Sequence, residues 1–156
     1  MDITVQPIGF VTSGRVEAID DAWDGEASEI TLTERFDAAS FHGLEAFSHV
    51  EVVYQFHLVS EDAVVLGTRH PRERLDWPPV GIFAQRGRVR PNRLAVSVCR
   101  LVDVVVDLER PKLAVVGLDA IVGSPVLDIK PVMSGFMPRG EIRQPTWATE
   151  IMADYW

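Results

Sequence analysis

The chain has 156 residues, 47% of them hydrophobic and 24% charged, with a net charge of −8, which is the composition of an ordinary globular protein of one domain. No apolar window approaches the roughly 18 residues of a membrane-spanning helix, and the first residues lack the pattern of a signal peptide, so we expect a cytoplasmic protein without a membrane partner. The single cysteine excludes an internal disulfide, and the four histidines show no H-x-x-x-H spacing, so we expect no bound metal.

The first third of the chain predicts two strands and a helix. Residues 3–11 are expected to form an edge strand, because an edge tolerates Pro7. Residues 20–29 read as a polar loop, and alternation of Ile30 and Leu32 with polar neighbours then predicts a half-buried strand. Residues 35–47 have apolar spacing typical of a short helix that ends near Gly43.

The rest of the chain predicts more strands, separated by turn residues. Strand-like runs follow at residues 49–59, 80–84, 94–107, 112–121 and 124–132. The tail, residues 143–156, is expected to hold one short helix that covers an edge or a partner. We therefore predict a mainly β protein, with one domain over residues 1–156: a closed or nearly closed antiparallel β-barrel of about six to seven strands with one or two short helices.

Positive charge is concentrated in one part of this acidic chain. Eight arginines and two acidic residues lie between Arg69 and Arg100, a net charge of +6. An acidic body with one basic segment fits a local anionic partner such as an RNA backbone. The alternative is a solvated loop in which the arginines pair with nearby acidic residues. Cys99, within an apolar run, is expected to be a core residue.

Three motifs, in order along the chain, identify a family. They are LEAFSHVEVVYQFHL (residues 44–58), GIFAQRGRVRPNRLAVS (residues 81–97) and VVGLDAIVGSPVLDIKPV (residues 115–132). They resemble, respectively, the L-x-x-F-S-H segment, the run G-x-F-A-T-R-S-P-x-R-P-N and the G-L-D-x-x-D-G-T-P-V-L-D-I-K-P signature of the TrmO-like (TsaA-like) tRNA methyltransferases. The resemblance implies a small β-barrel that binds S-adenosylmethionine and methylates N6 of threonylcarbamoyladenosine beside the tRNA anticodon. It also implies a homodimer with the cofactor site near the subunit interface.

The resemblance also implies a set of cofactor contacts. These fall on Ala22, Trp23, Asp24, His57, Leu58, Arg86, Val96, Asp119, Ala120, Ile121 and Val122. The family's T-R-S-P is replaced here by residues 85–88, its D-G-T-P by residues 122–125, and its Pro-Arg-Gln by residues 22–24. We expect the additional C-terminal domain of longer bacterial members to be absent.

Residue chemistry suggests roles for several of these positions. Arg86 can pair with the cofactor carboxylate, because a guanidinium and a carboxylate bind each other bidentately. Trp23 either stacks on the adenine or a substrate base, or anchors its loop by packing on the barrel. His57 either accepts a proton during catalysis or is a buried histidine satisfied by a hydrogen bond.

The basic segment supplies the candidates for RNA binding. Arg88, Arg90 and Arg93 are predicted to contact tRNA phosphates, on one face of an extended run, with a structural role as the alternative for Arg90. Two other functions stay open: methylation of a smaller acceptor, and non-catalytic binding of S-adenosylmethionine.

Overall fold

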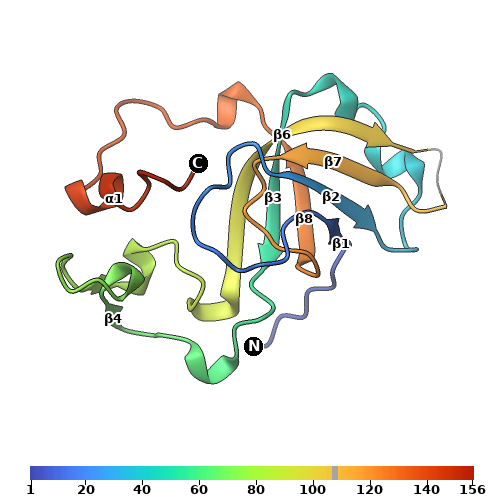
Figure 1. The fold of residues 1–156 in the computed structure, drawn as a ribbon. Coiled ribbons are helices and arrows are strands. Elements are labelled where there is room, and N and C mark those ends of the chain that lie inside the picture. The colour runs from blue at the N-terminus through green and yellow to red at the C-terminus, as the bar shows by residue number, and fades with distance from the viewer. Residues whose placement is uncertain (107–108) are drawn as a thin grey trace.

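A computed structural model describes residues 1–106 and 109–156 of the chain. In this part of the chain, six strands close into an antiparallel barrel in the order β1-β2-β7-β6-β3-β8, and a small β4–β5 hairpin lies apart from it (Figure 1). The barrel strands are β1 (Gly9–Ser13), β2 (Ala27–Leu32), β3 (His49–Gln55), β6 (Leu94–Val105), β7 (Lys112–Val116) and β8 (Pro125–Pro131). The hairpin pairs β4 (Thr68–Arg69) with β5 (Val80–Gly81). The predicted mainly β barrel is confirmed.

Helices are short and lie in the connections. One α-helix, α1, spans Thr146–Glu150 within the described residues and confirms the helix predicted for the tail. Single 3-10 turns span Ala38–Phe41, Leu44–Ala46, Glu61–Ala63, Pro71–Glu73, Ile82–Ala84, Pro91–Arg93 and Ser134–Phe136.

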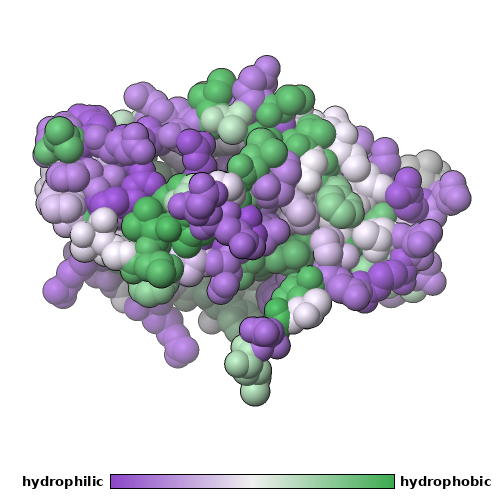
Figure 2. All heavy atoms as spheres, turned by 90° about the horizontal axis from the view of Figure 1, so that it is seen from below, coloured by the Kyte–Doolittle hydropathy of each residue, from purple (hydrophilic) through white to green (hydrophobic). Residues whose placement is uncertain are grey.

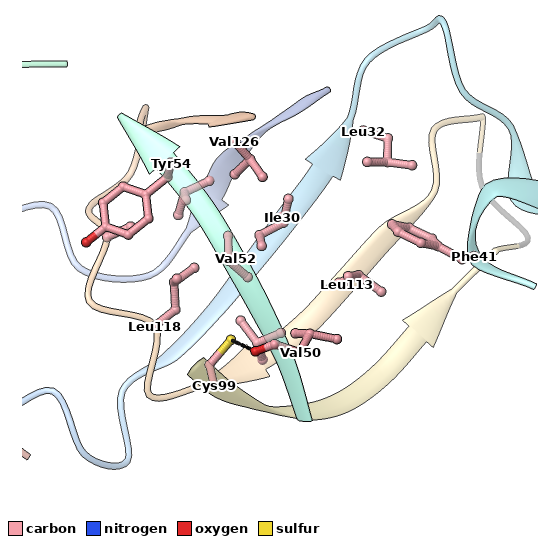
Figure 3. Close-up of a cluster of buried hydrophobic side chains, with 13 residues drawn as sticks. Ile30, Leu32, Phe41, Val50, Val52, Tyr54, Cys99, Leu113, Leu118 and Val126 are labelled. Atoms are coloured by element: carbon pink, nitrogen blue, oxygen red, sulfur yellow. Dashed lines mark hydrogen bonds between the residues drawn. The ribbon is translucent and has the colours of Figure 1, made fainter. Parts of the chain in front are cut away.

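The core fills the barrel interior with the inward residues of each strand. Along β3 the buried positions alternate as Val50, Val52 and Tyr54, which is the two-residue period of a strand with one face in the core. Figure 3 shows Tyr54 at one end of this core, with its hydroxyl pointing outward, and Phe41 at the opposite end. Cys99 is buried in the same cluster, as predicted. Burying each large aliphatic side chain contributes about 1.5–3 kcal/mol.

The first strand differs from its prediction. It begins at Gly9, and Ile3 and Val5 are exposed. It is also not an edge strand, because β1 pairs with β2 on one side and with β8 on the other. Pro7 lies before the strand, where its missing N–H breaks no ladder hydrogen bond.

The predicted helix over residues 35–47 is broken into two 3-10 turns. Asp37 caps the first turn by accepting a hydrogen bond from the Ala39 N–H at 3.0 Å. Gly43 then takes φ +86°, the left-handed conformation that ends a helical segment. The break lets Phe41 turn inward and close one end of the barrel, where it is buried.

Four other predicted strands are shorter than expected. Residues 80–84 form only β5 and a 3-10 turn, outside the barrel. The predicted strands over residues 49–59 and 112–121 end at Gln55 and Val116. The predicted strand over residues 94–107 ends at Val105, and Asp107 lies outside the described residues.

One mouth of the barrel collects the long connections. Since neighbouring strands are antiparallel, β1, β3 and β7 end at the mouth where β2, β6 and β8 begin. The connections over residues 14–26, 56–93 and 117–124 therefore all lie at this mouth. The chain leaves the barrel at the other end and returns, so that α1 lies on the side of the β4–β5 hairpin (Figure 1).

Hydrophobic residues also reach the surface. Figure 2 shows one face of the molecule on which they form patches between hydrophilic residues. On β6 the outward side chains of Leu94, Val96, Val98 and Val102 are 38% to 53% exposed. Among the described residues, we find no helix with the length and apolar character needed to traverse a bilayer.

Candidate functional site

The barrel mouth brings together His57 and the turn before β8. The Nδ1 atom of His57 lies 3.3 Å from the Ser124 hydroxyl. Gly123 has φ +90°, and a Cβ atom there would lie 3.3 Å from His57 Nε2, so this position needs glycine for both its conformation and its space. Partial burial lowers the pKa of His57 below its ordinary value. The imidazole is therefore held in place and kept neutral near pH 7.

Asp119 in the same turn is held by two tyrosines. The Tyr54 hydroxyl donates to the Asp119 backbone oxygen at 2.7 Å and to its Oδ1 atom at 3.0 Å. The Tyr155 hydroxyl, from the tail, donates to the Oδ2 atom of the same carboxylate. Burial, and then the negative charge of Asp119, raise the pKa of both phenols, so both stay protonated hydrogen-bond donors.

The backbone N–H groups at the end of this turn form hydrogen bonds within the protein, whereas those in its middle do not. The N–H groups of Val122 and Gly123 donate to the carbonyls of Arg15 and Val11, each at 2.8 Å. Ala120 is 1% exposed, yet within the described parts of the chain neither its N–H group nor that of Ile121 has a hydrogen-bond partner. Buried backbone groups are almost always paired. The N–H group of the buried Ala120, with that of the half-buried Ile121 beside it, thus fits a ligand that carries acceptor atoms.

Arg86 lies beside this turn. Its guanidinium donates to the backbone oxygen of Val96 at 2.7 Å. Val96 pairs with Val53, the residue before Tyr54, so Arg86 is bound to the strand next to the one that carries Tyr54. The positive charge of Arg86 acts to lower the pKa of Tyr54 and Tyr155, against the larger effects that raise it. The side chain of Val96 points out of the barrel, because its neighbour Ser97 is buried. Arg86 is exposed and available to an anionic group.

The loop of Ala22, Trp23 and Asp24 is tied to the same mouth. Trp23 is 4% exposed, and the Arg15 guanidinium lies 4.1 Å from its ring centroid. Arg15 also donates to the carbonyls of Asp21 and Ala22 and to the Glu26 carboxylate. Of the two alternatives for Trp23, these contacts favour the loop anchor. Asp24, in contrast, is exposed, as is Leu58 after His57.

The arginines predicted to bind RNA do not form one track. Arg88 lies 3.9 Å from the Asp20 carboxylate, Arg90 donates to the Gln85 carbonyl at 2.8 Å, and Arg93 donates to the Val59 carbonyl at 2.6 Å. The prediction of an extended run with one face is wrong, because the chain bends here and both Asn92 and Arg93 have positive φ. The hydrogen bond of Arg90 to the Gln85 carbonyl favours a structural role, which was the alternative for this residue.

Ion pairs account for much of the basic segment. Acidic partners lie near Arg69, Arg72, Arg74, Arg88 and Arg93. The segment thus has much of the character of the paired, solvated loop that was the alternative to an RNA-binding surface.

Sequence reasoning missed three residues of this mouth. Tyr54 was detectable as an inward residue at the end of an alternating strand. Arg15 and Tyr155 had no local signal, since each acts on a segment distant in sequence. In the described part of the chain, no three His, Cys, Asp or Glu side chains lie close enough to hold a metal ion.

Comparison with known proteins gives consistent matches. Residues 20–136 match the family model of the tRNA-methyltransferase O N-terminal domain. A Methanothermobacter thermautotrophicus protein described as a "Probable S-adenosyl-L-methionine-binding protein" is 35% identical over 136 residues, covering 84% of this chain and 90% of that protein. The tRNA (adenine(37)-N6)-methyltransferase of Escherichia coli is 36% identical over 110 residues, which cover 70% of this chain but 46% of the enzyme.

A solved structure matches as well. The crystal structure of TrmO from Pseudomonas aeruginosa superposes with a TM-score of 0.71 at 28% identity, over 92% of this chain and 61% of that one. This chain thus spans nearly all of the archaeal relative but only about half to two thirds of the bacterial ones.

Proposed function

The chain belongs to the family of the tRNA-methyltransferase O N-terminal domain, and on that premise we propose that it is a methyltransferase that uses S-adenosylmethionine and acts on N6 of an adenosine in tRNA. The observation that carries the proposal is the meeting of three segments at one barrel mouth. Arg86 is bound to β6 beside the strand of Tyr54, Tyr54 bonds Asp119, and His57 lies against Ser124, so residues of three family motifs meet at that mouth. Relatives named for this activity, or for binding this cofactor, support it.

The turn before β8 fits the adenine end of the cofactor. The unpaired N–H groups of Ala120 and Ile121 can donate to ring nitrogens of adenine, as in a preformed small-molecule site. Arg86 can bind the carboxylate of the methionine end, because it is exposed and permanently charged.

Methyl transfer asks the protein mainly for positioning. When bound, S-adenosylmethionine supplies an electrophilic methyl group on a sulfonium. The chain must hold the acceptor nitrogen in line with it, and such alignment can contribute about 7–11 kcal/mol. His57 can accept the proton that the nitrogen loses, because its imidazole is neutral and its Nε2 atom lies against Gly123, where no side chain covers it.

The finer identity of the acceptor is also proposed. We infer threonylcarbamoyladenosine beside the anticodon from the family resemblance. Arg88 is the strongest remaining candidate for a phosphate contact, since its ion pair with Asp20 is long and both side chains are about half exposed.

Methylation of tRNA tests the proposal. Purified protein is incubated with methyl-labelled S-adenosylmethionine and either threonylcarbamoylated or unmodified tRNA. Label in the modified tRNA alone supports the full proposal, and label in both supports only the tRNA methyltransferase. Cofactor binding without label in either tRNA would refute a tRNA substrate.

A second function has one observation in its favour. Arg90 and Arg93 use their guanidinium groups on backbone carbonyls, which weakens the RNA-binding surface. A smaller methyl acceptor, or cofactor binding without catalysis, would fit a mouth with few available cations. A binding assay that finds no affinity for tRNA at either low or high salt concentration would favour these alternatives.

We further propose a cytoplasmic homodimer. The outward row of Leu94, Val96, Val98 and Val102 on β6 gives an apolar surface next to the Val96 carbonyl that holds Arg86. A dimer through this row would place the cofactor site near the interface. Light scattering that gives only the monomer mass at micromolar concentration would contradict it.

A further inference from the structure

The C-terminal tail is docked on the candidate site by bonds to three separate segments. The carbonyls of Asp154 and Tyr155 accept from the N–H groups of Ala22 and Trp23 at 2.9 and 2.8 Å. Farther back, the Glu150 carboxylate accepts from the Trp77 indole N–H at 2.6 Å. The tail thus forms one wall of the mouth.

Tyr155 brings the tail to the carboxylate of the site. Its hydroxyl bonds to Oδ2 of Asp119, while Tyr54, from the barrel, bonds to Oδ1. A carboxylate held on both oxygens by phenol hydroxyls has a fixed orientation. Asp119 also precedes the unpaired N–H groups of Ala120 and Ile121, so this carboxylate lies next to the expected cofactor position.

The tail that supplies Tyr155 lies outside the residues matched by the family model. The family model ends at residue 136, before α1 and before Tyr155. Family motifs therefore say nothing of Tyr155, and its contact with a residue 36 positions away is visible only in the structure.

We propose that Tyr155 is a positioning residue that fixes the Asp119 carboxylate toward the bound cofactor, and that this charge makes the site prefer the cationic sulfonium of S-adenosylmethionine over the neutral thioether of S-adenosylhomocysteine. The inference rests on the proposed function, because it requires that the mouth bind this cofactor. Its physical basis is the attraction between opposite charges in a partly buried site, which a thioether does not experience. The tail thereby favours the substrate form over the spent product.

Affinities for the two ligands test the inference. The wild-type chain, Tyr155→Phe, Asp119→Asn and the double variant are titrated calorimetrically with each ligand. Thr149→Val is the matched control, because it deletes a hydroxyl of the same tail that contacts only Gln144 among the described residues. The measured quantity is the ratio of the two dissociation constants. Partial unfolding of a variant lowers both affinities by one factor and leaves this ratio unchanged.

We expect Tyr155→Phe to reduce the preference for S-adenosylmethionine by about tenfold, in line with the loss of a hydrogen bond to a charged group. Asp119→Asn should abolish the preference, and Tyr155→Phe should then have no further effect in the double variant. Thr149→Val should match the wild type.

The possible failures are distinguishable. If the wild type binds S-adenosylmethionine but Tyr155→Phe weakens both ligands equally, or neither, the inference is overturned and the proposed function stands. Tighter binding by Tyr155→Phe would overturn it too, since the tail would then obstruct the site. A wild type that binds neither ligand refutes the proposed cofactor and, with it, this inference.

Discussion

The Tyr54 hydroxyl donates to the backbone oxygen of Asp119 at 2.7 Å and to its carboxylate at 3.0 Å, so one side chain ties β3 to a turn 65 residues later in the chain. The phenol ring is buried in the barrel core while its hydroxyl points to the mouth. Tyr54 thus joins the packing of the fold to the geometry of the candidate site.

Removing that hydroxyl should cost stability. Tyr54→Phe keeps the ring but leaves the Asp119 carbonyl and one carboxylate oxygen without this donor. We expect the free energy of unfolding to fall by about 1–3 kcal/mol. Urea denaturation followed by circular dichroism measures it, with Thr149→Val as the control. An unchanged midpoint would show that water replaces the hydroxyl without loss.

Trp23 should behave as a structural anchor. Its ring is buried beneath Arg15, so Trp23→Ala is expected to lower the free energy of unfolding by about 3–5 kcal/mol. Trp156→Ala, a half-exposed tryptophan of the tail, is the control and should change it far less. If Trp23→Ala kept the stability of the wild type and lost only cofactor affinity, the ring would be a stacking surface instead.

The barrel was predictable because its strands have the two-residue period in their sequences, as Val50, Val52 and Tyr54 illustrate. The strand ends were harder to predict. The apolar run continues through Phe56, whose N–H still bonds the Arg93 carbonyl opposite it, but the chain then turns, and the Val59 N–H closes that turn on the Phe56 carbonyl. Ile3 and Val5 were predicted to lie in the first strand but are exposed before it, since β-forming residues without a paired neighbouring strand stay outside the sheet.

The candidate site was predictable only where motifs marked it. Arg86 and His57 were placed by resemblance, and the structure brings both to one mouth. The orientation of Arg90 and Arg93 was not predictable. The chain changes direction at Asn92 and Arg93, which both have positive φ, and an arginine in the sequence gives no indication of that conformation. The contact of Tyr155 with Asp119 was not predictable, since no sequence periodicity links a residue of the tail to a turn 36 positions earlier.

Cys99 should be inert in the folded protein. Burial raises the pKa of its thiol to about 12, so almost no thiolate exists at pH 8. We expect no reaction with a thiol reagent such as dithionitrobenzoate under native conditions, and one equivalent reacting in guanidinium chloride. Reaction of the native protein at the rate of the unfolded one would contradict the buried position.

Arg86 should control cofactor affinity. Arg86→Ala removes the exposed cation beside the Asp119 cluster, and loss of a charged hydrogen-bonding partner should weaken S-adenosylmethionine binding by about tenfold to a hundredfold. The control is Arg35→Ala, an exposed arginine that precedes the 3-10 turns at the opposite end of the barrel. Calorimetric titration measures both. Equal affinities of the two variants would remove Arg86 from the site.

The pH dependence of the methyl-transfer rate should follow the protonation of His57. Partial burial lowers its pKa below the ordinary value of about 6.5. A general base must be neutral, so the rate should rise with pH through this lowered pKa and be level above it. The native state should also lose stability as the pH falls from 6.5 through the same pKa, because protonation is less favourable in the folded protein.

The variants His57→Gln and His42→Gln separate this effect from the rest of the protein. His42 is exposed at the opposite end of the barrel, beside the 3-10 turns, so its replacement should leave the pH profile unchanged. His57→Gln should be slower and should lose the acidic limb. Rates are compared at pH values where circular dichroism finds each variant folded. A limb that persists in His57→Gln would assign the proton acceptor to another group, because glutamine cannot titrate in this range.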